Sequence, residues 1–247
     1  MAEAPAFYAR RGGRWADWWT LLHPPYTVWH LSYVVLGAAM ARRIDWGALG
    51  LSVLAFFLAV GIAAHAYDER TGHPLGTAFT DRALTGLAAT ALAGAVALGV
   101  YGVFWWAGTN WPLLVAIPLG AVLVVGYNAE LFGGLMHSDL VFGLGWGGFP
   151  VVVGYVAQSP GATWKGLVAV GVATAGGIAT TYAQRFLSTP ARQLRRRTAE
   201  VTGILTTTDG DVVAVDRRLL LAPLERALRS LSYGVPLVAL AALLSHL

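Results

Sequence analysis

The chain has 247 residues, of which 56% are hydrophobic and 12% are charged. Soluble proteins carry roughly 25% charged residues, so this chain lacks the polar side chains that would cover a water-exposed surface. It contains no cysteine, which excludes disulfides, a thiolate nucleophile and cysteine-ligated metal sites. The net charge of +4 comes almost entirely from arginine, which in so apolar a chain is typical of membrane orientation, and we expect no nucleic-acid partner.

Apolar stretches of about 20 residues, the length that spans a bilayer, predict an all-α, polytopic transmembrane bundle of about seven helices. In chain order, the expected helices cover residues 20–41, 47–67, 82–106, 112–129, 139–158, 163–187 and 221–245. A short segment (1–19) precedes the bundle (20–187), and a long connection (188–220) leads to the last helix in 221–247.

The arginines predict how the bundle is oriented. Arg10, Arg11 and Arg14 precede the first expected helix, and the run Arg195–Arg197 lies in the long connection. Positively charged segments tend to remain in the cytoplasm. We therefore expect an integral membrane protein with a cytoplasmic N-terminus and a cytoplasmic connection 188–220.

Three short signals predict local structure. Pro24 and Pro25 suit the first turn of a helix, where no backbone N–H partner is needed. Ser138 before Asp139 is a good helix N-cap pair, so Asp139 could serve only as part of a cap. Asp209-Gly210 between β-forming residues predicts a small cytoplasmic β-hairpin near 201–215.

The strongest candidate for chemistry is the cluster His65, Asp68 and Glu69 at the end of the second expected helix. Ionisable groups near hydrocarbon are costly and are therefore functional candidates. On a helix, His65 lies three and four residues from the two carboxylates, so all three can share a face. Such a group could exchange protons as a catalytic acid or base. His65 and Asp68 could instead bind a divalent metal, or the cluster could be a solvated helix end.

Further polar residues stand at the ends of other expected helices. Glu130 could be a catalytic residue or the ion-pair partner of Arg185, and His137 and Asp139 follow it in the same connection. Gln184 and Arg185 end the sixth expected helix, where a guanidinium could bind a phosphate or carboxylate. A shared cytoplasmic end for these segments and His65–Glu69 predicts one polar cavity facing the cytoplasm.

Two residues of the first expected helix complete the candidate substrate-binding set. Tyr26 and His30 are four residues apart and therefore share a helix face. His30 could contact a substrate, or it could form a hydrogen bond between helices.

The motifs together resemble the UbiA superfamily of intramembrane prenyltransferases. His23-Pro-Pro-Tyr-Thr followed by Gly37-Ala-Ala is similar to the family's first helix, and Ala64 to Gly72 is similar to its first Asp-rich motif. Tyr127-Asn-Ala-Glu130 through Asp139, and then Gly143 to Pro150, is similar to its fourth and fifth helices, which adds Tyr127 to the candidate substrate-binding residues.

The resemblance implies a helical bundle with a lipid-open cavity that binds an isoprenyl diphosphate through Mg²⁺. This sequence differs at the metal motifs. Only Asp68 coincides with a family carboxylate in the first motif, and Tyr182 to Thr189 holds no carboxylate where the second motif is expected. Mg²⁺ is therefore a possible cofactor for which the usual ligands are missing.

Two hypotheses remain open from the sequence. The chain could be an enzyme acting on an isoprenoid or similar membrane lipid, by prenyl transfer or by proton-initiated cyclisation, with His65, Asp68, Glu69 and Glu130 as a rebuilt polar site. It could instead be a non-catalytic lipid-, quinone- or pigment-binding protein, or a partner subunit, that kept the fold and lost the Asp motifs.

Overall fold

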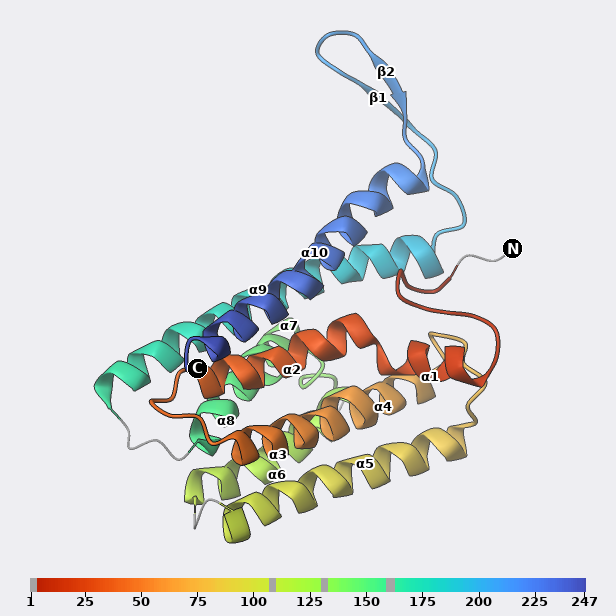
Figure 1. Cartoon of the computed structure of the whole chain (residues 1–247). Coiled ribbons are helices and arrows are strands. Elements are labelled where there is room, and N and C mark those ends of the chain that lie inside the picture. The colour runs from red at the N-terminus through yellow and green to blue at the C-terminus, as the bar shows by residue number, and fades with distance from the viewer. Residues whose placement is uncertain (1–3, 107–109, 130–132, 159–162) are drawn as a thin grey trace.

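The computed structural model describes residues 4–106, 110–129, 133–158 and 163–247 (Figure 1). Its helices are α1 (Arg14–Leu22), α2 (Pro24–Ala39), α3 (Trp46–Phe56), α4 (His65–Arg70), α5 (Asp81–Tyr101), α6 (Trp111–Asn128), α7 (Asp139–Phe142), α8 (Phe149–Ala157), α9 (Trp164–Arg196) and α10 (Arg217–Leu244). Wider π-helical turns continue some of them, as η1 (Phe57–Ala64), η2 (Gly102–Trp106) and η3 (Gly143–Gly148). Two strands, β1 (Ile204–Thr206) and β2 (Val212–Ala214), complete the described elements.

Six helical stretches in the described ranges are long and apolar enough to cross a membrane by length and composition. They are Trp46–Arg70, Asp81–Trp106, Trp111–Asn128, Asp139–Ala157, Trp164–Arg196 and Arg217–Leu244. Large apolar side chains remain exposed on their outer faces, among them Val172 (69% exposed) and Leu237 (63% exposed). Such a surface suits lipid rather than water, so the chain has the architecture of an integral membrane protein.

The expected helix 20–41 is divided in two, and the prediction of one continuous helix from residue 20 is wrong. His23 adopts a left-handed conformation (φ 47°, ψ 53°), and α2 starts at Pro24 as Pro24-Pro25 predicted. A residue before proline is disfavoured in the right-handed helical region, which explains the break. The remaining α2 has 16 residues and is shorter than the other spans, and most of it is buried.

The connection before the last helix is shorter than the predicted 188–220. Helix α9 continues through Pro190 to Arg196, and α10 begins at Arg217. Between them, β1 and β2 form the predicted antiparallel hairpin, which pairs Leu205 with Val213 and protrudes from the bundle (Figure 1). Asp209-Gly210 stands at its turn, where Gly210 has a positive φ of 89°.

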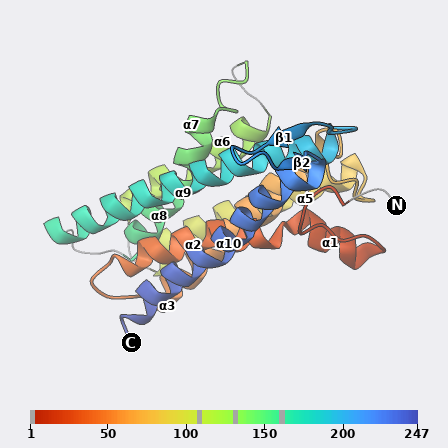
Figure 2. The ribbon, with the colours of Figure 1, turned by 90° about the horizontal axis from the view of Figure 1, so that it is seen from above.

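The centre of the bundle depends on close backbone packing of α2 against α8. A Cβ atom at Gly37 would lie 1.9 Å from the carbonyl oxygen of Val151, and one at Gly154 would lie 2.1 Å from that of Val34. Helix α10 packs on another side of α2 (Figure 2). Small residues allow such approaches in membranes, where lipid-like side chains give little drive for association.

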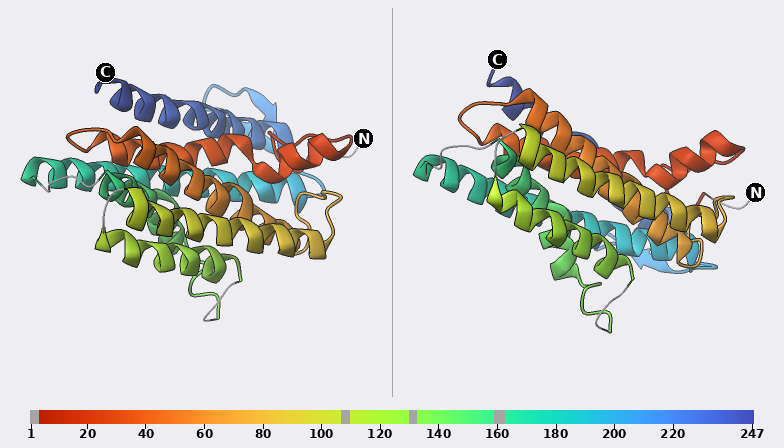
Figure 3. Two further views of the ribbon diagram at one scale, coloured as in Figure 1. Left: turned by 60° about the horizontal axis from the view of Figure 1, so that its bottom comes forward. Right: turned by 90° about the horizontal axis from the view of Figure 1, so that it is seen from below.

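The remaining helices form a second group beside this centre. α3 with its continuation α4, then α5, and then α6 run side by side along the bundle (Figure 3). The N-terminal segment, α1, the end of α4, the end of α9 and the start of α10 gather at one end of the molecule (Figure 1). That end carries the candidate residues.

We predict that Gly154→Ala destabilises the protein, whereas Gly86→Ala does not. The added methyl group at residue 154 must displace the backbone of α2, and overpacking typically costs about 1–3 kcal/mol. Residue 86 has open space around an added Cβ atom, and alanine favours a helix over glycine. Thermal unfolding in detergent should show a lower midpoint for G154A alone. Equal midpoints for the two variants would contradict tight α2–α8 packing.

Candidate functional site

A cavity of about 310 Å³ lies where the N-terminal segment, α2, α4, α6, α9 and α10 meet. Its lining includes eight of the sequence-predicted residues, from four separate parts of the chain: Tyr26, His30, His65, Asp68, Tyr127, His137, Gln184 and Arg185. The structure therefore brings together polar groups that are distant in the sequence, such as Tyr26 and Arg185, which are 159 residues apart.

Two imidazoles in ring contact, tilted by 31° to each other, form one wall of the cavity. The ring centroids of His23 and His65 are 4.1 Å apart, and the Nδ1 atom of His65 lies 3.1 Å from the carbonyl oxygen of Gly61 in the preceding π-helical turn. His23 is 9% exposed, and its Nε2 atom has no hydrogen-bond partner among the described residues. His23 owes its position to the break between α1 and α2, which sequence reasoning did not predict.

Asp68 follows His65 by about one helical turn in the same part of the lining. It lines the cavity and is exposed. None of the described residues forms a salt bridge with its carboxylate. Asp68 is therefore accessible to a bound molecule and to water, as a proton donor or acceptor must be.

His30 is a deeper polar group. It is 4% exposed, and its Nδ1 atom lies 3.1 Å from the carbonyl oxygen of Trp146. Tyr33, one turn further along α2, has a hydroxyl 2.6 Å from the indole nitrogen of Trp29 and 2.7 Å from the hydroxyl of Thr180. Both observations agree with the interpretation of α2 as a source of interhelical hydrogen bonds, while His30 still reaches the cavity.

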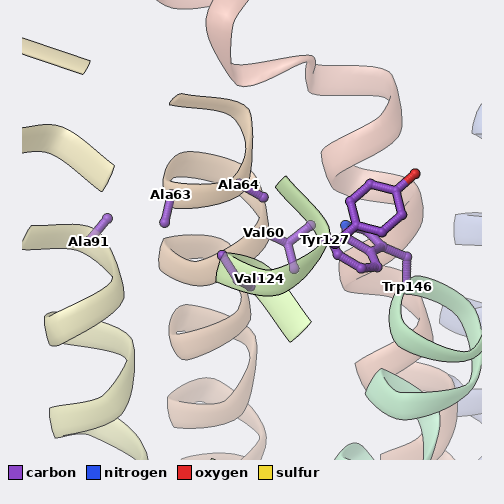
Figure 4. Packing of buried hydrophobic residues seen from close by; sticks show 7 residues of the cluster. All are labelled: Val60, Ala63, Ala64, Ala91, Val124, Tyr127 and Trp146. Atoms are coloured by element: carbon purple, nitrogen blue, oxygen red, sulfur yellow. The ribbon is translucent and has the colours of Figure 1, made fainter. Parts of the chain in front are cut away.

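The opposite wall is aromatic and carries one guanidinium. Tyr127 stacks on His137 with ring centroids 4.3 Å apart, and it contacts Trp146 in a tilted arrangement with centroids 4.5 Å apart. Figure 4 shows the Tyr127 and Trp146 rings together, with the tyrosine hydroxyl pointing away from the alkyl side chains. Arg185 donates to that hydroxyl at 2.9 Å and to Asp139 at 2.7 Å.

These contacts decide between two interpretations of Asp139. Ser138, not Asp139, caps α7 by accepting a hydrogen bond from the backbone N–H of Val141 at 3.3 Å. Asp139 does not line the cavity; its carboxylate forms the ion pair with Arg185 that links α7 to α9. Glu130, the other expected partner of Arg185 and a predicted catalytic residue, lies outside the described residues.

Glu69 has a structural position rather than a place in the cavity lining. Its side chain is 0% exposed, and its two oxygens accept hydrogen bonds from Leu75 N, Thr77 N and Thr77 Oγ1, each at 2.9 Å. Glu69 thus holds the loop between α4 and α5 against the helix end. Helical spacing predicted that Glu69 shares a face with His65. It did not predict that the loop between α4 and α5 folds back over Glu69.

The sequence did not predict that several further groups reach the cavity. The N-terminal segment contributes Phe7 and Tyr8, and the extended end of α9 contributes Arg192 and Arg196. Tyr8 is buried, and this burial raises the pKa of its phenol well above the usual value, so it stays protonated. The arginine run was interpreted as an orienting patch, because no local signal shows which arginines face inward.

The described residues do not fit the metal site that the family resemblance implies. Among them, no group of three or more His, Cys, Asp or Glu side chains is placed to hold a metal ion. His65 and Asp68 provide at most two ligands, whereas Mg²⁺ takes an octahedral set of six. A Mg²⁺ ion at this position would depend on water and on substrate oxygens for most of its ligands.

A second, almost wholly apolar cavity of about 120 Å³ lies between α3, α5, α6 and α8. One buried cluster, with members in η1, α5, α6 and η3, lies between this cavity and the polar cavity along α6. In α6, Gly120 and Ala121 line the apolar cavity, Val124 belongs to the cluster, and Tyr127 lines the polar cavity. Figure 4 shows this cluster, with Ala63 on the side of Ala91 and with Val60 and Ala64 on the side of Tyr127 and Trp146. The two cavities are thus about 10 Å apart along the helices at 1.5 Å per residue.

No family model matches this chain, and neither a curated protein nor a solved structure matches it. The resemblance to the UbiA superfamily therefore depends on the residues quoted above.

We predict that Glu69→Gln and Asp68→Asn have different effects on stability. An amide at residue 69 would place a donor against backbone donors, and losing hydrogen bonds to a charged group costs about 1.5–3 kcal/mol. Asp68 has no salt bridge to lose among the described residues, so D68N should unfold at nearly the wild-type temperature. Thermal unfolding in detergent measures both. A D68N variant as unstable as E69Q would show that Asp68 is also a structural residue.

Proposed function

We propose that this chain is an integral membrane enzyme that acts on an isoprenoid or a similar lipid, by prenyl transfer or cyclisation. The observation that carries the proposal is the alignment of the two cavities along the same helices. One contains ionisable and aromatic groups, and the other is lined by alkyl and aromatic side chains. An amphiphile with a polar head and a long apolar chain has this distribution of polarity.

The lining of the polar cavity supports chemistry through a carbocation. Tyr127, Trp146 and Phe142 form a continuous aromatic surface, in which Phe142 and Trp146 stack with ring centroids 5.6 Å apart. Aromatic faces attract cations, most strongly away from water. A positive charge on an isoprenoid would therefore be stabilised beside these rings.

Asp68 is the best candidate for the acid or base that starts or ends such a reaction. Its exposure lets it exchange a proton with water between turnovers. His65 is the nearest member of the lining along α4 and would orient the substrate or relay the proton. Prenyl transfer through Mg²⁺ fits less well because the described residues supply too few oxygen ligands.

The resemblance to the UbiA superfamily supports an isoprenoid over other lipids. Its motifs occur in the family's order, and the residues that carry them line the polar cavity from α2, α4 and α6. The loss of the metal carboxylates also supports a second candidate, a non-catalytic protein that binds a lipid, quinone or pigment. The two candidates predict the same occupied cavity and differ in turnover.

We expect protein purified in mild detergent to retain a bound isoprenoid. Mass spectrometry of extracted lipids should show it enriched over the membrane from which the protein came. Val124→Trp should reduce this retention, because Val124 belongs to the buried cluster between the two cavities along α6, and an indole there would block a chain that extends from one cavity to the other. Val122→Trp is the matched control, because residue 122 is 51% exposed on the same helix. Retention of phospholipid alone would contradict the isoprenoid assignment.

We also expect Asp68→Asn to abolish turnover of a linear isoprenoid, because the amide can neither donate nor accept the proton. Chromatography with mass spectrometry distinguishes a cyclised product, which keeps the substrate mass, from a prenylated one. Glu200→Gln, a change at an exposed carboxylate outside the cavity lining, should leave the rate unchanged. Pyrophosphate release from geranylgeranyl diphosphate with Mg²⁺ should be absent or very slow. Full activity of D68N would exclude the role given to Asp68.

A further inference from the structure

The N-terminal segment lies across the polar cavity and contributes four lining residues. The Nη1 atom of Arg195 donates to the carbonyl oxygen of Ala4 at 3.1 Å, and the Nε atom of Arg196 donates to that of Pro5 at 3.0 Å. Phe7 and Tyr8 then insert their rings, and Tyr8 packs on His23 with centroids 4.9 Å apart. A segment distant in sequence is thus held by arginine side chains of α9.

The arginines of this region differ in how their charge is balanced. Arg185 pairs with Asp139, and Arg195 pairs with Glu225. For Arg192 and Arg196, the described residues provide no carboxylate within 4.0 Å. Arg196 bonds to a neutral carbonyl and Arg192 to the hydroxyl of Thr189 at 3.3 Å. A guanidinium binds an oxyanion more strongly than a neutral acceptor, so these two groups favour an anion.

We propose that Arg192 and Arg196 form an oxyanion site for a phosphate or diphosphate group, and that the backbone carbonyl of Pro5 occupies part of this site when no anion is bound. Binding of the anion displaces residues 4–9 from the mouth of the cavity. The proposal deepens the proposed function and rests on it for the biological ligand, which is the charged head of the membrane lipid.

A second observation shows that the covered state carries a cost. His23 is buried beneath Tyr8, and its Nε2 atom has no hydrogen-bond partner among the described residues. Leaving a buried polar atom unpaired is unfavourable. Withdrawal of Tyr8 would expose this nitrogen to water or to a ligand. The packing of Tyr8 on His23 stabilises the covering position of the N-terminal segment, whereas the unpaired nitrogen of His23 destabilises it. An anion that binds the two arginines can therefore displace this segment.

The absence of cysteine allows a direct test with single-cysteine variants. Ala6 belongs to the segment, lines the cavity and is 9% exposed, and Ala199, exposed in the connection after α9, is a matched alanine. We would measure the rate of reaction with a bulky maleimide in detergent containing EDTA. We expect A6C to react about tenfold more slowly than A199C, because it reacts only when the segment opens. Inorganic pyrophosphate or dodecyl phosphate should raise the A6C rate severalfold and leave A199C unchanged.

Arginine variants then identify the site. In the A6C background, Arg196→Gln should raise the rate without a ligand and remove the response to either anion. Arg192→Gln should weaken the response without freeing the segment. Arg197→Gln is the control, because Arg197 does not line the cavity, and it should respond as A6C alone does. If R196Q does not fold, the ligand response of A6C and the R192Q variant still test the proposal.

Each outcome bears on the proposal. A response to dodecyl phosphate alone assigns the site to a lipid head group, and a response to pyrophosphate alone assigns it to a free anion. An A6C variant that reacts as fast as A199C without a ligand, or that responds to neither anion, overturns it. A loss of response in R197Q overturns the assignment to Arg192 and Arg196. The assay needs no turnover and no isoprenoid, so a failed lipid-retention experiment beside a positive labelling result would remove the proposed function and leave the anion site.

Discussion

The backbone contact between α2 and α8 is the constraint on which the rest of the bundle depends. Gly37 and Gly154 each face a carbonyl oxygen of the other helix, so any side chain larger than hydrogen at either position would meet the backbone of its neighbour. This contact fixes α2 in the centre, and with it the line of His23, Tyr26 and His30 along one side of the polar cavity. Gly147 and Gly177 repeat the device between η3 and α9, where an added Cβ atom would lie 2.5 Å from a backbone oxygen. Glycines at the α2–α8 and η3–α9 contacts thus set the positions of α2, η3 and α9, which all contribute to the cavity lining.

The charged side chains around the polar cavity differ in whether they form ion pairs within the protein. The ion pairs Arg185–Asp139 and Arg195–Glu225 join helices and use up both charges, as costly groups near hydrocarbon usually do. Asp68, Arg192 and Arg196 form no ion pair with any charged side chain in the described part of the chain. The polar residues therefore fall into two groups: those that join helices through ion pairs and those that are available to a ligand. The sequence did not show which residue belongs to which group, because the ion-pair partners are known only from the structure.

Local signals allowed much of the fold to be predicted. Hydrophobic stretches identified the spans, Asp209-Gly210 identified the hairpin, and Pro24 marked a helix start, because each depends on neighbours in sequence. Eight of the polar residues that line the cavity were named from the sequence, because the expected topology placed their helix ends at one end of the bundle. The role of Glu69 could not be predicted, because it depends on a loop that returns over the helix. The inward position of Arg196 likewise depends on a hydrogen bond to Pro5, 191 residues away in the sequence, which leaves no periodic pattern in either segment.

The π-helical turns of η1 have a consequence for how this architecture can change. They lie immediately before His65 and widen the helix that carries it. A π-helical turn accommodates an extra residue between two α-helical segments, and such turns are frequent at functional sites. Removing one residue there would return the turn to α-helical geometry and leave the helix on either side with nearly the same faces toward the interior, whereas a deletion in a regular stretch would turn everything beyond it by about 100°. The segment before His65 is therefore a place where the chain can lose a residue while the imidazole and the carboxylate of Asp68 keep facing the cavity.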